Sequence, residues 1–150
     1  MPLFKLLGMV FLFSASLFWG WYKSALLKRR ARALYLMSLA LKTFAETIRV
    51  EQSELKILCP KIFNFEGAKC EGEIPVFSED FFSVEDINSF LEFFSLCGMA
   101  DTRTEYEKTL AFAQRVEQKC LDAEKLCREN SKTYMSIGLL GGVGLCIFFL

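Results

Sequence analysis

The sequence predicts an all-α membrane protein, in which two terminal transmembrane helices form a hairpin and bracket a cytoplasmic helical bundle. The apolar residues gather at the two ends of the 150-residue chain, where residues 6–22 and 135–150 contain no charged side chain. Every acidic residue and 17 of the 18 basic residues lie between these stretches, with Lys5 as the exception. Such segregation is typical of chains whose ends are embedded in lipid.

Both apolar stretches approach the length of a membrane span. At 1.5 Å per residue they extend ~25 Å and ~24 Å, against a hydrocarbon core of ~30 Å. Lipid offers no hydrogen-bond partner to the backbone, so each stretch should cross as a helix. If the two were instead buried helices of a soluble protein, the remaining residues would be too few to cover both on all sides.

A cleaved signal peptide is the main alternative for residues 6–22. Signal peptides carry a basic start and a small-residue exit, whereas here Ser14-Ala15-Ser16 lies mid-stretch and bulky aromatic residues follow it. The positive charge comes after the stretch, which keeps residues 23–134 in the cytoplasm. We expect this charge to contact lipid headgroups rather than nucleic acid. The residues are Lys23, Lys28, Arg29, Arg30 and Arg32.

Residues 23–134 are predicted to form a helical domain. Apolar residues recur at three- and four-residue steps along 24–50, and a similar stripe of small residues runs along 103–134. We expect these two long helices to pack antiparallel. A shorter helix is expected over 84–97. Residues 61–79 are expected to form a loop, with at most a brief strand near its end.

Several residues mark the expected ends of these elements. Ser83 is predicted to be the N-cap of the 84–97 helix, and Gly98 lies where a C-terminal cap belongs. Thr102 and Glu105 have the spacing of a capping box. A further short helix is expected to start at Ser53 and to be closed by Pro60.

The middle of the chain is acidic. Residues 66–107 contain eleven acidic residues, with Lys69 and Arg103 as the only basic ones. Solvation of a small helical domain accounts for much of this charge, but an acidic face could also dock a basic cytosolic partner. The residues expected to form that face are Glu79, Asp80, Glu85 and Asp86.

Small residues recur at helix-face spacing within the two predicted spans. They are Ser16 and Gly20 in the first span, and Gly138 and Gly142 in the second. Small-x-x-x-small faces let helix backbones approach closely in lipid. The pattern does not decide whether these faces join the two spans of one chain or two neighbouring proteins.

The sequence does not predict an enzyme. The chain has no histidine, which removes the Ser-His and Cys-His arrangements of nucleophilic catalysis. It also has no phosphate-binding glycine loop and no Cys-x-x-Cys pair. The six cysteines are expected to be free thiols, because five would face a reducing cytosol and Cys146 lies within a span. We therefore expect no cofactor, metal, nucleic acid or small-molecule substrate.

Three segments of the chain carry a family resemblance. The segment Phe90-Leu-Glu-Phe-Phe-Ser-Leu-Cys-Gly98, followed by Met99-Ala-Asp101, combines a helix with a Leu-x-Gly-x-x-Asp turn. The first predicted span begins with Lys5-Leu-Leu-Gly8, and the second contains Gly138-Leu-Leu-Gly-Gly142. In their order and spacing, these segments resemble the stage III sporulation protein AB family of endospore-forming bacteria. Residues 52–82 match poorly.

The resemblance implies a helical domain similar to those of type II secretion platform (F-type) proteins. It implies a non-enzymatic part in the channel-like complex between mother cell and forespore, located in the outer forespore membrane. The implied partners are membrane lipid, other stage III sporulation membrane proteins and a secretion-type ATPase. The alternative from another class is a regulatory membrane protein that controls another integral membrane protein through its spans.

Overall fold

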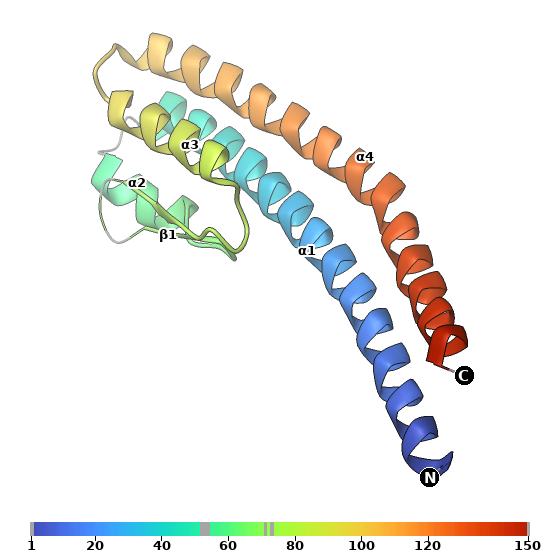
Figure 1. The fold of residues 1–150 in the computed structure, drawn as a ribbon. Coiled ribbons are helices and arrows are strands. Elements are labelled where there is room, and N and C mark those ends of the chain that lie inside the picture. Colours follow the sequence, from blue (N-terminus) through green and yellow to red (C-terminus); the bar gives the residue numbers. More distant parts are fainter. Residues whose placement is uncertain (1, 52–54, 71, 73, 150) are drawn as a thin grey trace. The chain divides into compact units, whose positions relative to one another are not determined.

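A computed structural model describes residues 2–51, 55–70, 72 and 74–149; at residues 2–6, 9, 51, 55, 56, 145, 146, 148 and 149 it describes the backbone alone. The described part is mostly helical, as predicted. Its elements are α1 (Pro2–Glu51), α2 (Leu55–Ile62), β1 (Ala68–Lys69), β2 (Val76–Phe77), α3 (Val84–Leu96) and α4 (Thr102–Phe149) (Figure 1).

The chain divides into two compact units, and the long helices α1 and α4 contribute to both. We call them the terminal unit (Met1–Arg29 with Ala123–Leu150) and the central unit (Arg30–Asp122). The predicted membrane and cytoplasmic helices are thus continuous, since neither α1 nor α4 is interrupted between the two predicted segments.

The predicted antiparallel packing of the two long helices is confirmed. In the terminal unit, Ser16 hydrogen-bonds to Gly138 and Ser24 to Ser131, so the contact positions rise along α1 as they fall along α4.

In the central unit, the predicted apolar stripe of α1 faces the core. Its members are fully buried at Leu34, Met37, Leu41 and Phe44, and the facing stripe of α4 is buried at Ala113, Val116 and Cys120. Small side chains on α4 allow the close approach that lets the Cys120 thiol reach the Ala31 carbonyl at 3.5 Å. These two stripes make the helix pair the centre of the core.

Aromatic rings extend this core to the other elements. The ring of Phe44 on α1 lies 5.4 Å from that of Phe63, just after α2, and Phe63 lies 4.9 Å from Phe94 on α3. The ring of Phe77 on β2 lies 5.0 Å from that of Phe90 on α3. Edge-to-face and tilted arrangements of this kind are the favoured ones for aromatic pairs.

The segment after α1 differs from the prediction. Pro60 does not close α2, which continues to Ile62, and a hydrogen bond from the Phe63 amide to the Cys59 carbonyl completes the turn around the proline. A proline in the last turn forfeits one backbone hydrogen bond while the following amides still find partners. The predicted start at Ser53 lies outside the described residues.

The predicted loop 61–79 contains a small antiparallel hairpin, in which Ala68 pairs with Phe77 and Lys69 with Val76. Only the second strand was expected. Gly67 has φ +105°, a backbone conformation that residues with a side chain rarely adopt. Its carbonyl accepts a hydrogen bond from the Ser78 amide. Each strand is two residues long, too short to produce a two-residue alternation, so periodicity gave no signal for β1.

Two predicted caps are confirmed. Ser83 is the N-cap of α3, with its hydroxyl accepting the Asp86 amide, and Asp86 completes a capping box. Gly98 follows the C-terminus of α3 with φ +84°, the left-handed conformation usual for glycine at this position.

The predicted capping box at the start of α4 is wrong. Asp101, one residue earlier, caps the helix, because its carboxylate accepts the Thr104 amide and its carbonyl accepts the Glu105 amide. The side-chain and backbone hydrogen bonds from Thr104 lower the pKa of Asp101. Glu105 instead turns back to accept the Ala100 amide at 3.1 Å.

The stability of the central unit should depend strongly on the aromatic side chains of its core. We expect Phe44→Ala to reduce the free energy of unfolding of the central unit by about 3–5 kcal/mol, because the ring is completely buried and packs against the rings of Phe63 and Phe94. Tyr35→Ala, on the exposed side of α1, should change it by about 0.5 kcal/mol or less. Thermal unfolding followed by circular dichroism would measure both, and equal losses would contradict the assigned core.

Candidate functional site

The terminal unit holds the first candidate site, a seam of small residues between α1 and α4. The hydroxyl of Ser16 donates a hydrogen bond to the Gly138 carbonyl at 2.6 Å, and the hydroxyls of Ser24 and Ser131 are hydrogen-bonded to each other. Gly20 lies between these contacts and is buried. The four small residues predicted to pack in the membrane, Ser16, Gly20, Gly138 and Gly142, thus lie on the facing sides of the two helices of one chain.

The glycines of this seam leave no room for side chains. A Cβ atom at Gly20 would lie 2.8 Å from the Tyr134 carbonyl oxygen, and one at Gly138 would lie 3.0 Å from the Ser16 carbonyl oxygen. A Cβ at Gly142 would lie 2.6 Å from the ring of Phe13. Two of these three neighbours are backbone atoms, which cannot move aside without separating the helices.

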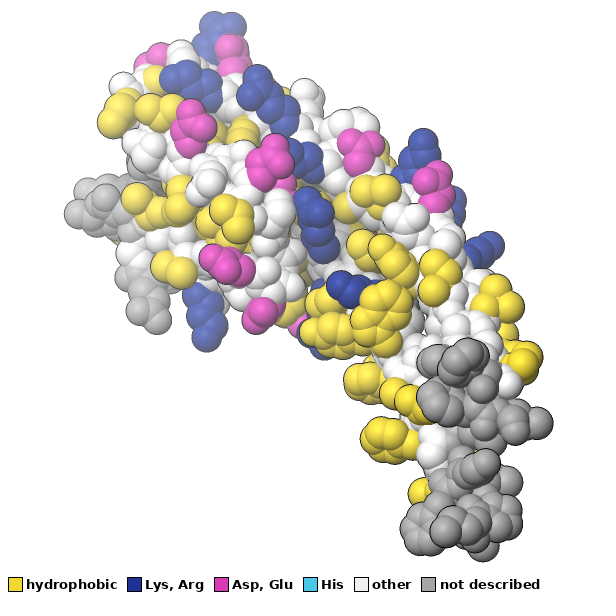
Figure 2. Space-filling model, in the orientation of Figure 1, with side chains coloured by type: hydrophobic (Ala, Val, Ile, Leu, Met, Phe, Trp, Pro, Cys, Tyr) yellow, Lys and Arg dark blue, Asp and Glu magenta, His cyan; other side chains and the backbone are white. Residues whose placement is uncertain are grey.

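The outward side of the terminal unit is apolar. Several large apolar side chains on this side are more than half exposed. They are Phe11, Phe18 and Trp21 on α1, and Ile137, Leu140 and Ile147 on α4. Figure 2 shows hydrophobic side chains along the described part of the terminal unit, whereas hydrophobic and charged side chains are interspersed over the central unit. An apolar surface of this extent is not typical of a free monomer in water.

One stretch of the described chain, Val10–Val50, contains an 18-residue window that is long and apolar enough to cross a membrane. Only 11 % of this window is buried, unlike the core helix of a soluble protein. Within the described residues no second stretch meets the same standard. The second predicted span, 135–150, includes 145, 146 and 148–150, whose side chains lie outside the described part.

Aromatic and basic residues follow the apolar stretch of α1. The ring of Trp19 meets that of Tyr134 edge to face at 6.4 Å, and Trp21 and Tyr22 are exposed. Of the five basic residues predicted to lie at the membrane surface, Lys23, Lys28, Arg29 and Arg32 are exposed without an ion pair among the described residues. Arg30 is different, since it belongs to the ion cluster described below.

The seam yields a test in the full-length protein in detergent micelles. Gly20→Leu and Gly138→Leu should each lower its stability by about 1–3 kcal/mol, because the new side chain meets backbone at contact distance. Gly144→Leu is the matched control, since a Cβ at Gly144 has nothing within 4 Å. Unfolding in increasing SDS would measure the difference, and equal behaviour of all three variants would rule out the seam.

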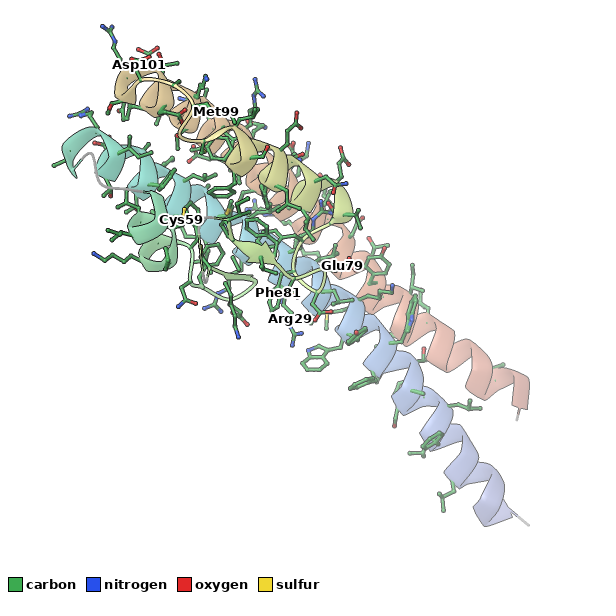
Figure 3. The ribbon with its side chains drawn as sticks, turned by 90° about the vertical axis from the view of Figure 1, so that its left-hand side faces the viewer. Arg29, Cys59, Glu79, Phe81, Met99 and Asp101 are labelled. Atoms are coloured by element: carbon green, nitrogen blue, oxygen red, sulfur yellow. The ribbon has the colours of Figure 1, made fainter. Side chains whose placement is uncertain are left out.

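The second candidate site is the acidic surface of the central unit. Glu79, Asp80 and Glu85 are exposed, as docking residues must be. Figure 3 shows Glu79 and Phe81 on the segment that leads from β2 to α3. Asp86 was predicted to belong to the same surface, and this prediction is wrong, because its side chain is only 3 % exposed.

Asp86 instead joins three helices. One carboxylate oxygen accepts a hydrogen bond from the guanidinium of Arg30 on α1 at 2.9 Å. The other accepts one from the ammonium of Lys119 on α4, also at 2.9 Å. The Ser83 hydroxyl lies 2.7 Å from the same carboxylate. A carboxylate at the third position of a capping box points back toward the helix start, where α1 and α4 flank α3. The sequence shows the spacing between Ser83 and Asp86, but it does not predict the ion pairs of Asp86 with Arg30 and Lys119.

The electrostatics of this cluster favour the ionised acid. Burial alone would raise the pKa of Asp86, but hydrogen bonds from Lys119, Ser83 and Arg30 outweigh it and lower that pKa below its usual 3.8. The two cations remain 45 % and 40 % exposed, so water still solvates them. The cluster therefore stabilises the position of α3 and offers no free carboxylate to a partner.

The cysteines do not form an activated thiol site among the described residues. Cys59, Cys70 and Cys120 are buried. Burial, followed by the nearby Glu105 carboxylate, raises the pKa of Cys97 to about 12 despite the opposing charge of Lys108. Near neutral pH this thiol is protonated and is a poor nucleophile.

No protein-family model, curated protein or solved structure matches the chain. The resemblance to the sporulation family therefore stays a prediction, carried by the residues that suggested it.

The Asp86 cluster predicts a pH-dependent contribution to stability. Asp86→Asn should cost about 2 kcal/mol at neutral pH, less than the ~3–5 kcal/mol of a fully buried ion pair, because both cations are half solvated. Since the folded pKa lies below the unfolded one, this contribution is complete above 3.8 and is lost as pH falls through the folded pKa.

Thermal unfolding of both proteins between pH 7 and pH 2.5 would measure this dependence. Glu85→Gln, which changes an exposed neighbour, should have no such effect. A constant difference between wild type and Asp86→Asn down to the lowest pH would argue against the ion cluster.

Proposed function

We propose that this chain is a non-enzymatic membrane scaffold, anchored by a hairpin of two transmembrane helices and carrying a cytoplasmic helical domain that docks a partner protein. One observation carries the proposal. In the terminal unit, α1 and α4 turn their small residues toward each other and their large apolar residues outward. In water such an arrangement exposes what should be buried, whereas in lipid it is the favoured one.

The paired helices also favour an anchor over a cleaved signal peptide. Gly20 and Ser16 are packed directly on Gly138 and the Tyr134 backbone. Removing residues 6–22 would leave that face of α4 uncovered. The positive charge of Lys23, Lys28 and Arg29 supports a cytoplasmic location for the domain that follows.

The exposed acids Glu79, Asp80 and Glu85 are the proposed docking residues for a basic partner. They lie in a segment with few basic residues, and none of the three forms an ion pair within the described chain. Unpaired surface charges of one sign attract a partner of the opposite sign over about 10 Å at ordinary ionic strength.

The narrower form of the proposal places this scaffold in the complex that joins mother cell and forespore. It rests on the family resemblance, which implies a location in the outer forespore membrane and a secretion-type ATPase as the cytosolic partner. Expression confined to endospore formation would support this form, and constitutive expression would remove it.

The regulatory alternative requires free small-residue faces that could contact another integral membrane protein. Ser16, Gly20, Gly138 and Gly142 are engaged with each other in one chain. This arrangement favours the scaffold over the regulator.

Reversing the acidic surface tests the docking step. A variant carrying Glu79→Lys, Asp80→Lys and Glu85→Lys should recover a cytosolic partner at least about tenfold less well than wild type at low salt, where charge attraction is strongest. The control reverses Asp122, Glu124 and Glu129, which are also exposed, and this gives the same change of net charge elsewhere.

Quantitative pull-down from detergent-solubilised membranes would measure recovery. The docking surface is refuted if both variants recover the partner as well as wild type does.

A further inference from the structure

A groove between α3 and α4 in the central unit is not used by either candidate site. It consists of two adjoining hollows of about 320 Å³ and 260 Å³. Both are lined by Phe93 and Leu96 from α3 and by Phe112 and Arg115 from α4. The shared lining makes them one continuous surface feature rather than two separate pockets.

The floor of this groove is apolar. The rings of Phe93 and Phe112 are stacked, with centroids 4.3 Å apart and planes inclined by 2°. Both rings are only partly buried, and Leu96 beside them is 56 % exposed. A stacked pair of aromatic rings next to an exposed leucine is a surface on which a partner can bury apolar side chains.

The α4 side of the groove is basic. Lys108 lines one hollow, Lys119 lines the other, and Arg115 lines both. Arg115 and Lys108 have no ion pair among the described residues, whereas Lys119 is held by Asp86. This sign is opposite to that of the neighbouring acidic surface.

Acidic side chains do little to offset this charge. Glu105 lines one hollow but is 6 % exposed and accepts the Ala100 amide, so its carboxylate points inward. Glu92 on α3 is the one exposed acid of the lining. The accessible charge at the middle of the groove is therefore the guanidinium of Arg115, which suits a carboxylate because it can form two parallel hydrogen bonds.

The geometry points to this groove as the docking site for an amphipathic helix of a second protein, one that presents neighbouring apolar side chains and a carboxylate on the same face. The apolar side chains cover Phe93, Phe112 and Leu96, and the carboxylate pairs with Arg115. Helices bind grooves in this way through side chains at i, i+3 or i+4 and i+7. This surface is distinct from the acidic one, so the protein would contact two segments of opposite charge.

Photo-cross-linking in the native host tests this inference on the full-length chain. A photoreactive phenylalanine analogue replaces Leu96 in the groove or, as the control, Leu91, which is also exposed on α3 but does not line the groove. We expect a polypeptide adduct from position 96 and not from 91. The cross-linked segment, sequenced by mass spectrometry, should have helical apolar spacing with Asp or Glu on the apolar flank.

Charge reversal then tests the role of Arg115. Arg115→Glu should reduce the adduct at position 96 about tenfold, and Arg115→Gln less, whereas Arg115→Lys should retain most of it. Circular dichroism would establish whether each variant is folded. If Arg115→Glu is not folded, the adduct yield of Arg115→Gln decides whether Arg115 contributes to docking.

Four results would overturn the inference: no adduct at position 96; an adduct only with lipid, nucleic acid or a second copy; a segment without an acidic residue; or a yield that Arg115 does not affect. Reversal of Glu79, Asp80 and Glu85 leaves the groove unchanged, so this experiment fails or succeeds independently of the acidic docking surface.

Discussion

The close approach of α1 and α4 at Gly20 and Gly138 is the constraint on which the terminal unit depends. A single added methyl group at Gly20 would collide with the Tyr134 carbonyl oxygen, and one at Gly138 would lie only 3.0 Å from the Ser16 carbonyl oxygen. Backbones so close bury little hydrophobic surface between them, so water alone would give this pair little reason to form. In lipid the balance changes, because tight van der Waals contact and the Ser16–Gly138 hydrogen bond drive association while apolar side chains face outward.

The central unit is organised by a different interaction. There large buried side chains of α1 pack on small residues of α4, and α3 is held by its buried aromatic rings and by one carboxylate that receives cations from α1 and α4. The Asp86 cluster orients the exposed acids before α3 and in its first turn, and also the groove between α3 and α4. One ion cluster around a buried carboxylate thus supports two surfaces of opposite charge.

The sequence predicted the helices well and the individual side-chain roles unevenly. The long helices, the Ser83 cap and the turn at Gly98 follow from periodicity and from local hydrogen bonding, which a short stretch of chain determines. Asp86 was wrongly assigned to the docking surface because its burial depends on an ion pair with Lys119, 33 residues away. No local sequence pattern predicts a contact between residues so far apart. The groove was missed for the same reason, since Phe93 and Phe112 come from different helices.

The central claim is that lipid surrounds the terminal unit, and the two tryptophans of the chain, Trp19 and Trp21, report on it directly. Their fluorescence can be measured in the full-length protein reconstituted into bilayers with bromine atoms at chosen depths of the acyl chain. We predict strong quenching, greatest when the bromines lie just below the headgroups, where aromatic side chains concentrate. Emission that no brominated lipid quenches, at the wavelength of a water-exposed indole, would contradict the membrane anchor and the scaffold built on it.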